Sequence, residues 1–540
     1  MSLPVSRRHL LAASPATLLA ADAIAQTLGD PGPQGVVRLQ PGVHQVNRDT
    51  NIRSDVIVEP GARIAIAAGA RLTLLGDFSA PIGHVFTGSG TVDLSRSRII
   101  EAYPEWWGAN PENEADSAAA LEFCLAAHPV MQLGPHSYYI SRTLVVDRSN
   151  RHIRGSGQRW IGAGTGTRLV LTGDGDVMRI GTLKRPGSIN DFVQGVMVSD
   201  LQLTRARPPS GSGHDGAAGM RMRHVLFADI SRVDSSENVN GFALGGAVRS
   251  YLRDCSAFRS VHGGSTVFRG YACDGHVEIG AAGGNASIIL IDCNARTGGN
   301  PPLSECVGML MDGAFADTTV TNFETGSVAV GMRLSGDASR LSESKRRSGH
   351  ADVRILAPVL DQCTNVGIEI SDTSDYTMLD ISDAYVASAP GSRAAMSFDR
   401  VRGLTTVRGG QLIGWTAPGA VGIVATASEG LDISGVKLLQ FTEPARFTRC
   451  RDLALDLAIN QPEGKGRGPA VLLVDCGETK VAARIKGTAG AFAGGVRVTG
   501  SATRAVSVDA GSVRPESVGG GQNRVALTGV PSGAVTLSGP

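Results

Sequence analysis

One short phrase recurs through the chain from about residue 195: a small residue or Val, then Gly, then alternating apolar positions, then a polar or Gly turn. Its copies are Asn240–Gly245, Val307–Gly313, Val330–Gly336, Val366–Ile370, Val421–Val424 and Gly495–Gly500. The glycines of these copies lie 67, 23, 36, 55 and 73 residues apart. Those intervals suit multiples of a unit of roughly 20–36 residues with variable loops and some degenerate copies.

Each copy predicts a short strand, because period-2 alternation over a few residues is bounded by Gly, Asn, Asp or Ser. Gly accounts for 70 of the 540 residues, about twice its usual share. Gly and Asn tolerate the left-handed backbone of tight corners, so the pattern favours a solenoid whose coils stack around a common interior. A propeller would keep a more even blade length. The sequence therefore predicts an all-β solenoid.

One helix stands out before the strands. Residues 115–128 place Ala118, Leu121, Cys124 and Leu125 on one face, with Asp116 as the expected N-cap. We expect this helix to cover the exposed end of a strand stack, whose backbone groups would otherwise lack partners.

The first 25 residues have the layout of an export signal. An arginine pair, Arg7-Arg8, precedes a weakly apolar run that ends at Ala23-Ile24-Ala25. The pair before Leu-Leu resembles a twin-arginine signal, and an ordinary secretory signal is the alternative. No later stretch approaches the ~18 apolar residues of a membrane span. We therefore expect a periplasmic or secreted protein with no membrane span.

Charge and cysteine content exclude several classes. The 51 basic and 50 acidic side chains nearly balance, which argues against a nucleic-acid partner. Eight cysteines occur without any CxxC pair, so a zinc site has no support. Cys255, Cys273 and Cys293 recur near the ends of apolar stretches, and we expect stacked free thiols in the core. No cofactor is predicted.

Several stretches between residues 104 and 157 carry a family resemblance. Pro104–Ala109, the helix, Gly134-Pro135-His136-Ser137-Tyr138 and Ile153–Gly157 resemble the start of pectate-lyase-like and rhamnogalacturonase-like proteins, whose superfamily includes many phage tailspikes. The resemblance implies a right-handed parallel β-helix. Residues 35–92 are similar to the small β-rich leader that precedes such helices. The expected division is 1–25 export signal, 26–100 leader and 101–540 β-helix with its capping helix.

The catalytic signature of the hydrolase branch is missing. Of its motifs only Arg484-Ile485-Lys486 occurs, late in the chain and without the acids ahead of it. The calcium-dependent lyase branch needs clustered acids, and Asp372, Asp375, Asp380 and Asp383 supply acids without a calcium-binding loop. Calcium is thus unsupported by a motif, and no catalytic residue follows from the resemblance.

Candidate site residues come from the stacking of coils instead. Equivalent residues of adjacent coils lie about 4.8 Å apart, within the range that two carboxylates need to act on a glycosidic bond. Acids, His and Arg are densest between residues 229 and 324. The catalytic candidates there are Asp234, Glu237 and His262. The substrate-binding candidates are Arg259, Arg296, Glu305 and, further on, Trp415. The same region also holds Asp274, His276, Glu278, Asp317 and Glu324.

The sequence therefore favours an exported carbohydrate-active protein that cleaves a polysaccharide by hydrolysis or β-elimination in a groove on the side of the β-helix. Elimination needs a cation to neutralise a uronate carboxylate, and the 45 arginines could supply it. A polysaccharide-binding or structural surface protein without turnover is the alternative. The resemblance to tailspikes adds a homotrimeric spike-type adhesin as a third reading.

Overall fold

The computed structural model describes residues 35–158, 166–184, 186–207, 217–260, 267–276, 278–279, 282–283, 285–298, 305–336, 350–415, 420–461, 468–488, 491–509 and 524–538. The expected export signal lies outside these residues. The chain divides into two compact units. The smaller unit extends to Tyr139 and includes Arg151–Arg154, and the larger comprises Ile140–Asn150 and the chain from Gly155 onward.

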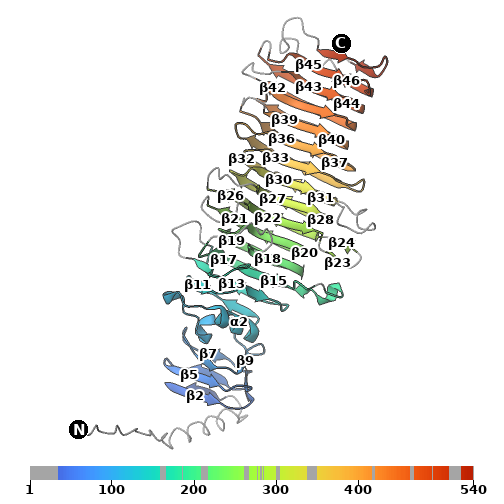
Figure 1. Ribbon diagram of the computed structural model, residues 1–540. Coiled ribbons are helices and arrows are strands. Elements are labelled where there is room, and N and C mark those ends of the chain that lie inside the picture. Colours follow the sequence, from blue (N-terminus) through green and yellow to red (C-terminus); the bar gives the residue numbers. More distant parts are fainter. Residues whose placement is uncertain are drawn as a thin grey trace, which may run out of the picture. The chain divides into compact units, whose positions relative to one another are not determined.

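The smaller unit begins with three coils of short parallel strands (Figure 1). Its three sheets are β1 (Val36–Leu39), β4 (Asp55–Val58) and β7 (Phe78–Ser79); β2 (Gly42–Val46), β5 (Ala62–Ile66) and β8 (Phe86–Gly88); and β3 (Thr50–Ile52), β6 (Arg71–Leu74) and β9 (Thr91–Asp93). Buried and more exposed residues alternate along these strands, as they do in β5. The β-rich leader is thus confirmed, and it is itself a short solenoid.

The predicted helix follows the leader. The unit continues with η1 (Pro104–Trp107), η2 (Pro111–Asn113), α2 (Ala118–Ala127), β10 (Val130–Gln132), β11 (Ser137–Ile140) and β13 (His152–Arg154). The four residues predicted to share one face of α2 are all buried, and the helix packs on η1 and β9. The N-cap is Ser117, not Asp116, and the side chain of Ser117 makes no capping hydrogen bond. Asp116, one residue before the N-cap, makes that bond instead: its Oδ1 accepts the amide of Ala118.

Two of the stretches that carry the family resemblance meet inside this unit. The hydroxyl of Tyr138 donates to Glu105 Oε1 at 2.5 Å and accepts the amide of Gly134 at 2.8 Å. Burial and the neighbouring Glu105 raise the pKa of Tyr138 far above its ordinary value. Trp106, next to Glu105, is buried edge-on against Phe78 at 5.0 Å. These motif residues therefore hold the unit together.

The larger unit is a right-handed parallel β-helix with three faces, and its strands stack in chain order in Figure 1. The first face consists of β12 (Leu144–Val146), β15 (Met178–Gly181), β18 (Ala218–Leu226), the first half of β20 (Asn240–Arg253), β22 (Val267–Gly275), β27 (Glu305–Gly313), β30 (Val330–Ser335), β33 (Val366–Ser371), β36 (Ala394–Asp399), β39 (Val421–Thr426), β41 (Glu443–Thr448), β43 (Pro469–Val474), β45 (Gly494–Thr499) and β47 (Val525–Thr528).

The second face follows each first-face strand in the chain. It consists of β16 (Val193–Gln194), the first halves of β17 (Met197–Arg205) and β19 (Asp229–Ser236), the second half of β20, β25 (Asn285–Ile291), β28 (Phe315–Thr321), β31 (His350–Leu356), β34 (Met378–Ser382), β37 (Leu404–Arg408), the first halves of β40 (Glu429–Leu439), β42 (Arg451–Gln461) and β44 (Gly477–Gly487), β46 (Arg504–Asp509) and β48 (Val535–Ser538).

The third face closes each coil. It consists of β14 (Thr167–Leu171), the second halves of β17 and β19, β21 (Ser256–Arg259), β26 (Asn294–Thr297), β29 (Glu324–Gly326), β32 (Val359–Cys363), β35 (Tyr385–Ser388), β38 (Gln411–Ile413) and the second halves of β40, β42 and β44. A short antiparallel hairpin of β23 (Glu278–Ile279) and β24 (Ala282–Gly283) follows β22.

The glycines of the recurring phrase form one row across the first face. Register pairing aligns Gly241 with Gly270, and Gly270 with Gly308. A Cβ on Gly270 would lie 2.3 Å from the Cβ of Ala295 and 2.6 Å from the carbonyl oxygen of Gly308. The row accepts only the smallest side chain here because the third face and the next coil both press on it. Gly270 is one of the degenerate copies that made the interval from Gly241 to Gly308 so long.

Single residues with positive φ turn the corners between faces. Asp200, Arg232, Asp254, Asp292 and Asn322 occupy successive corners between the second and third faces, with φ between 51° and 63°. All eight cysteines are free and buried, which confirms the predicted thiols in the core. Among the described residues, none of the helices combines the length and the hydropathy that a membrane crossing requires.

Candidate functional site

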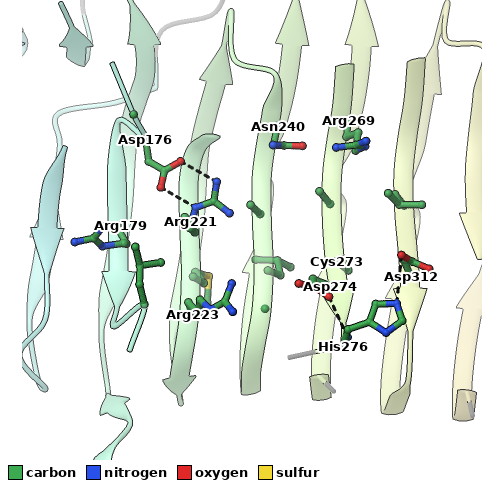
Figure 2. Close-up of a pocket in the computed structure, with 18 of the residues that line it drawn as sticks. Asp176, Arg179, Arg221, Arg223, Asn240, Arg269, Cys273, Asp274, His276 and Asp312 are labelled. Carbon is green, nitrogen blue, oxygen red and sulfur yellow. Dashed lines mark hydrogen bonds and ion pairs between the residues drawn. The ribbon is translucent and has the colours of Figure 1, made fainter. Parts of the chain in front are cut away.

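A groove of about 740 Å³ crosses the strands of the first face (Figure 2). Two rows of register partners form its floor. The first row is Arg179, Arg221, Ala243, Ala272 and Leu310, and the second is Gly181, Arg223, Gly245, Asp274 and Asp312. Both rows point outward, because the residues between them are buried in the core.

The groove exists because the middle of both rows has small side chains. Ala243, Gly245 and Ala272 come from β20 and β22 and leave space above the sheet. Arginines flank this space at β15 and β18, and Leu310 and Asp312 flank it at β27. The arrangement gives a trough with a cationic end and an acidic end, separated by an uncharged floor.

Three arginines make up the cationic end. Arg221 forms a two-point ion pair with Asp176, with Nε–Oδ2 and Nη2–Oδ1 distances of 2.7 and 3.0 Å. The buried Nε atoms of Arg179 and Arg223 have no hydrogen-bond partner, and neither guanidinium has a carboxylate partner among the residues that the structure describes. Arg221 is therefore neutralised, whereas nothing in the described part of the chain compensates the charges of Arg179 and Arg223.

A buried arginine supports this end from inside the β-helix. Arg205 donates to the carbonyl oxygen of Gly175 at 2.5 Å and to Asn238 Oδ1 at 2.7 Å. Burial lowers the pKa of Arg205 to about 10, although the nearby Asp176 and Asp174 raise it. The bond to Gly175 fixes the backbone just before Asp176, and so fixes the acid that orients Arg221.

The acidic end carries two carboxylates on adjacent coils. Asp274 of β22 and Asp312 of β27 are register partners. His276 follows Asp274, and its Nε2 lies 3.4 Å from Asp312 Oδ2, so a protonated imidazole forms an ion pair there. The amide of His276 also donates to Asp274 Oδ1 at 3.0 Å. Figure 2 shows the three side chains gathered at this end.

One wall of the groove contains Arg269. Its guanidinium binds Glu305 at two points, both 2.8 Å long. Glu305 was predicted to bind substrate, and the structure places it beside the groove as the partner that holds Arg269. Because both atoms of the carboxylate are engaged, Arg269 is electrically compensated like Arg221.

The other predicted site residues lie on the third face. Asp234 is only 3 % exposed and accepts hydrogen bonds from Gln202 Nε2 at 2.6 Å, Ser236 Oγ at 2.7 Å and Ser256 Oγ at 2.6 Å. The positive φ of Arg232 resets the alternation of the strand at the corner. Asp234 alternates with Val233 and Ser235, which face the core, so it lies on the outer side of the third face. It is nevertheless buried there, and it links three coils instead of lining an open groove.

Glu237, Arg259 and Arg296 are close to Asp234 along the same face. Glu237 accepts the hydroxyl of Ser260 at 2.8 Å. Arg259 is 4 % exposed and donates to the carbonyl of Val267, and burial lowers its pKa despite the nearby Glu237. Arg296 pairs with Glu324. The structure thus groups these residues on one face, and it buries Asp234 and Arg259.

His262 lies outside the described residues. Trp415 is 55 % exposed with a φ of 50°, directly after β38 on the third face. It does not line the groove of the first face.

Two repeated patterns in the sequence correspond to the groove. Asp274-Gly275 and Asp312-Gly313 end two copies of the same strand, and only their register shows that the acids are neighbours. Asp274 and His276 lie in the part of the sequence that is densest in acids, His and Arg, between residues 229 and 324. At the other end, Met178-Arg179 and Met220-Arg221 repeat the same alternation.

The described residues offer no metal site. Within them, no group of three or more His, Cys, Asp or Glu side chains is placed to hold an ion.

No family model and no curated protein sequence matches the chain. Among solved structures, a mutant tailspike of E. coli bacteriophage HK620 in complex with a hexasaccharide has a TM-score of 0.56 at 8 % identity, over 79 % of this chain and 77 % of that chain. The same tailspike in complex with a pentasaccharide has a TM-score of 0.55 at 8 % identity, over 79 % and 77 % of the two chains.

Tailspike protein 3 of bacteriophage CBA120 has a TM-score of 0.45 at 14 % identity, over 81 % of this chain. The chain spans only 61 % of the length of that protein. Similarity at these identities concerns the fold. The chain therefore has the right-handed parallel β-helix fold that is also found in phage tailspikes.

Proposed function

We propose that the protein binds a polysaccharide across the first face and hydrolyses it between Asp274 and Asp312. The observation that carries this proposal is the register pairing of the two acids at the end of an open groove, with His276 Nε2 only 3.4 Å from Asp312 Oδ2. The saccharides bound to the HK620 tailspike support the choice of ligand class.

The groove suits an extended chain. It crosses the strands, so each step to the next coil adds about 4.8 Å, a length similar to that of one sugar ring. Its uncharged middle, made by Ala243, Gly245 and Ala272, accepts rings without a charge penalty. A polymer lying along this path would pass both acids at one end.

The two acids have different roles in this proposal. A protonated His276 favours the ionised form of Asp312, which then attacks the anomeric carbon as the nucleophile. Asp274 protonates the departing glycosidic oxygen as the general acid. A glycosyl ester forms on Asp312, and Asp274 then removes a proton from the water that hydrolyses this ester. The net reaction adds one water across the glycosidic bond.

Hydrolysis fits this end of the groove better than β-elimination. Elimination requires a cation that neutralises a carboxylate on the reacting sugar. Arg223, in the same row as Asp274, is two strand spacings away, about 10 Å, which is too far to neutralise a carboxylate on the reacting sugar. Arg269 lies five residues before Asp274 on the same strand, and it is already bound at two points by Glu305.

The test is to incubate the full chain with a panel of neutral and anionic bacterial polysaccharides. We expect new reducing ends from at least one of them, without the ultraviolet absorbance of an unsaturated product. Unsaturated product would replace hydrolysis by elimination. Binding without any product would leave only the non-catalytic, polysaccharide-binding role.

Export belongs to this proposal as well. Residues 1–25 would direct the folded chain through the twin-arginine route to the periplasm or the medium, where extracellular polysaccharide is found. Replacement of Arg7 and Arg8 by Lys would then retain the precursor in the cytoplasm.

A further inference from the structure

We infer that the cationic end of the groove is a subsite for an anionic group that the substrate carries two or three sugars away from the cleaved bond. The inference rests on the proposed function for the position of that bond. It adds a substrate class: a heteropolysaccharide in which anionic sugars alternate with neutral ones.

The first argument is the separation of charge. Asp176 compensates Arg221 at the cationic end, and Glu305 compensates Arg269 at the wall. Arg179 and Arg223 line the same groove with no carboxylate partner among the residues that the structure describes. The two guanidinium groups come from adjacent strands and point in opposite directions in Figure 2. Each can pair with a carboxylate or a sulfate ester, which accepts two hydrogen bonds from one guanidinium.

The second argument is distance. Arg223 and Asp274 occupy the same row, with Gly245 between them. They are therefore two strand spacings apart, about 10 Å, and Asp312 is one spacing further. Because a sugar ring is about as long as one spacing, the anionic ring and the cleaved bond are separated by at least one ring.

The third argument is the lining between the two ends. Ala243, Gly245 and Ala272 offer no charge to a ring above them. At the far end, the ionised Asp312 repels a second anionic ring. A homopolymer of uronates would place a carboxylate at both ends of the groove, so the groove discriminates against it.

Four tetrasaccharide probes test the subsite with the full chain. The first contains one glucuronate among neutral hexoses. The second is its carboxyl-reduced form, in which glucose replaces the glucuronate. The third carries a sulfate ester in place of the carboxylate, and the fourth is a tetraglucuronate. Titration calorimetry measures binding to the wild type and to Asp312→Asn, so that binding is read without turnover.

We expect at least one of the two singly charged probes to bind roughly tenfold or more tightly than the carboxyl-reduced probe, because hydrogen bonds to charged groups are the stronger ones. The better of the two identifies the anionic group. The preference should weaken as salt is raised. Tetraglucuronate should bind more weakly than the singly charged glucuronate probe.

The double variant Arg179→Gln/Arg223→Gln should lose this preference and bind the carboxyl-reduced probe as the wild type does. Each single variant should lose part of it, which covers the case in which the double variant fails to fold. Arg497→Gln is the matched control, because Arg497 occupies the same register row at β45, outside the groove.

Equal binding of the charged and carboxyl-reduced probes would overturn the inference, as would a double variant that retains the preference, or binding of none of the four. These outcomes differ from failure of the proposed function, which is the absence of released reducing ends. If the protein prefers the charged probe but releases no product, the inferred anionic subsite is supported and the proposed hydrolysis is contradicted.

Discussion

Asp274 and Asp312 are register partners on adjacent coils, and His276 Nε2 lies 3.4 Å from Asp312 Oδ2. Replacement of either acid by Asn should lower the rate of hydrolysis by about 10²–10⁴-fold, the usual contribution of a positioned acid or base. Release of reducing ends from the best polysaccharide measures this. Asp399→Asn is the control, because Asp399 lies further along the same row, outside the groove. Equal rates of hydrolysis in Asp312→Asn and in this control would contradict the catalytic role of Asp312.

The stereochemistry of cleavage is a second prediction. Adjacent strands place equivalent side chains about 4.8 Å apart, close to the carboxyl separation of retaining glycosidases. Proton NMR during the first minutes of reaction should therefore show that the new reducing end has the anomeric configuration of the bond that was cleaved. Inversion would require a water molecule between the acids and would contradict the role of Asp312 as nucleophile.

The glycine row predicts a sharp stability effect. Gly270→Ala places a Cβ 2.3 Å from the Cβ of Ala295 and 2.6 Å from a backbone oxygen of the next coil. Overpacking of this kind costs about 1–3 kcal/mol of unfolding free energy, since neither neighbour is a flexible side chain. Denaturant unfolding measures the loss. Gly468→Ala is the matched control, because its Cβ would meet nothing within 4 Å.

Asp234 should affect stability rather than chemistry. Asp234→Ala leaves the hydrogen-bond donors of Gln202, Ser236 and Ser256 without their acceptor at a buried position. Each unsatisfied buried group costs about 1–3 kcal/mol, so a clear loss of unfolding free energy is expected. Hydrolysis below the melting temperature should stay close to the wild-type rate. An Asp234→Ala variant that is as stable as the wild type but has no activity would contradict this prediction and would indicate that Asp234 acts in the active site.

His128 predicts a pH dependence of the smaller unit. Its Nδ1 accepts the amide of Val130 at 3.1 Å, and burial lowers its pKa below the ordinary value of 6.5. Below pH 6.5 the unfolded chain therefore binds a proton at His128 more readily than the folded chain does. The contribution of His128 to the unfolding free energy is complete above pH 6.5 and is lost as the pH falls below it. Thermal melting should show this loss in the wild type. His128→Asn should have a flatter profile between neutral and mildly acidic pH, and an unchanged profile would contradict the assignment.

Much of the fold could be predicted because local chemistry repeats. Gly241 and Gly308 mark strands whose backbones approach their neighbours closely. Cys255 follows an apolar stretch in the sequence, and its thiol is buried in the core as predicted. The two glycines are not neighbours, because Gly270 lies between them in the row. Loops of different length hid this copy from the sequence pattern.

The site was harder to predict because inward and outward positions exchange at every corner. The left-handed residue Arg232 turns Val233 into the core and leaves Asp234 on the outer side of the third face, where Asp234 is still only 3 % exposed. The sequence places Asp312 at the end of one copy of the recurring phrase, Val307–Gly313. Its pairing with Asp274 depends on register, which no local pattern encodes.

The most direct measurement is a crystal structure of the Asp312→Asn variant soaked with a polysaccharide fragment that the wild type cleaves. We predict sugar density across β18, β20, β22 and β27, with one ring beside Arg223 and a glycosidic oxygen beside Asp274. Density on the third face, beside Arg296 and Glu324, together with an empty groove on the first face, would contradict the account.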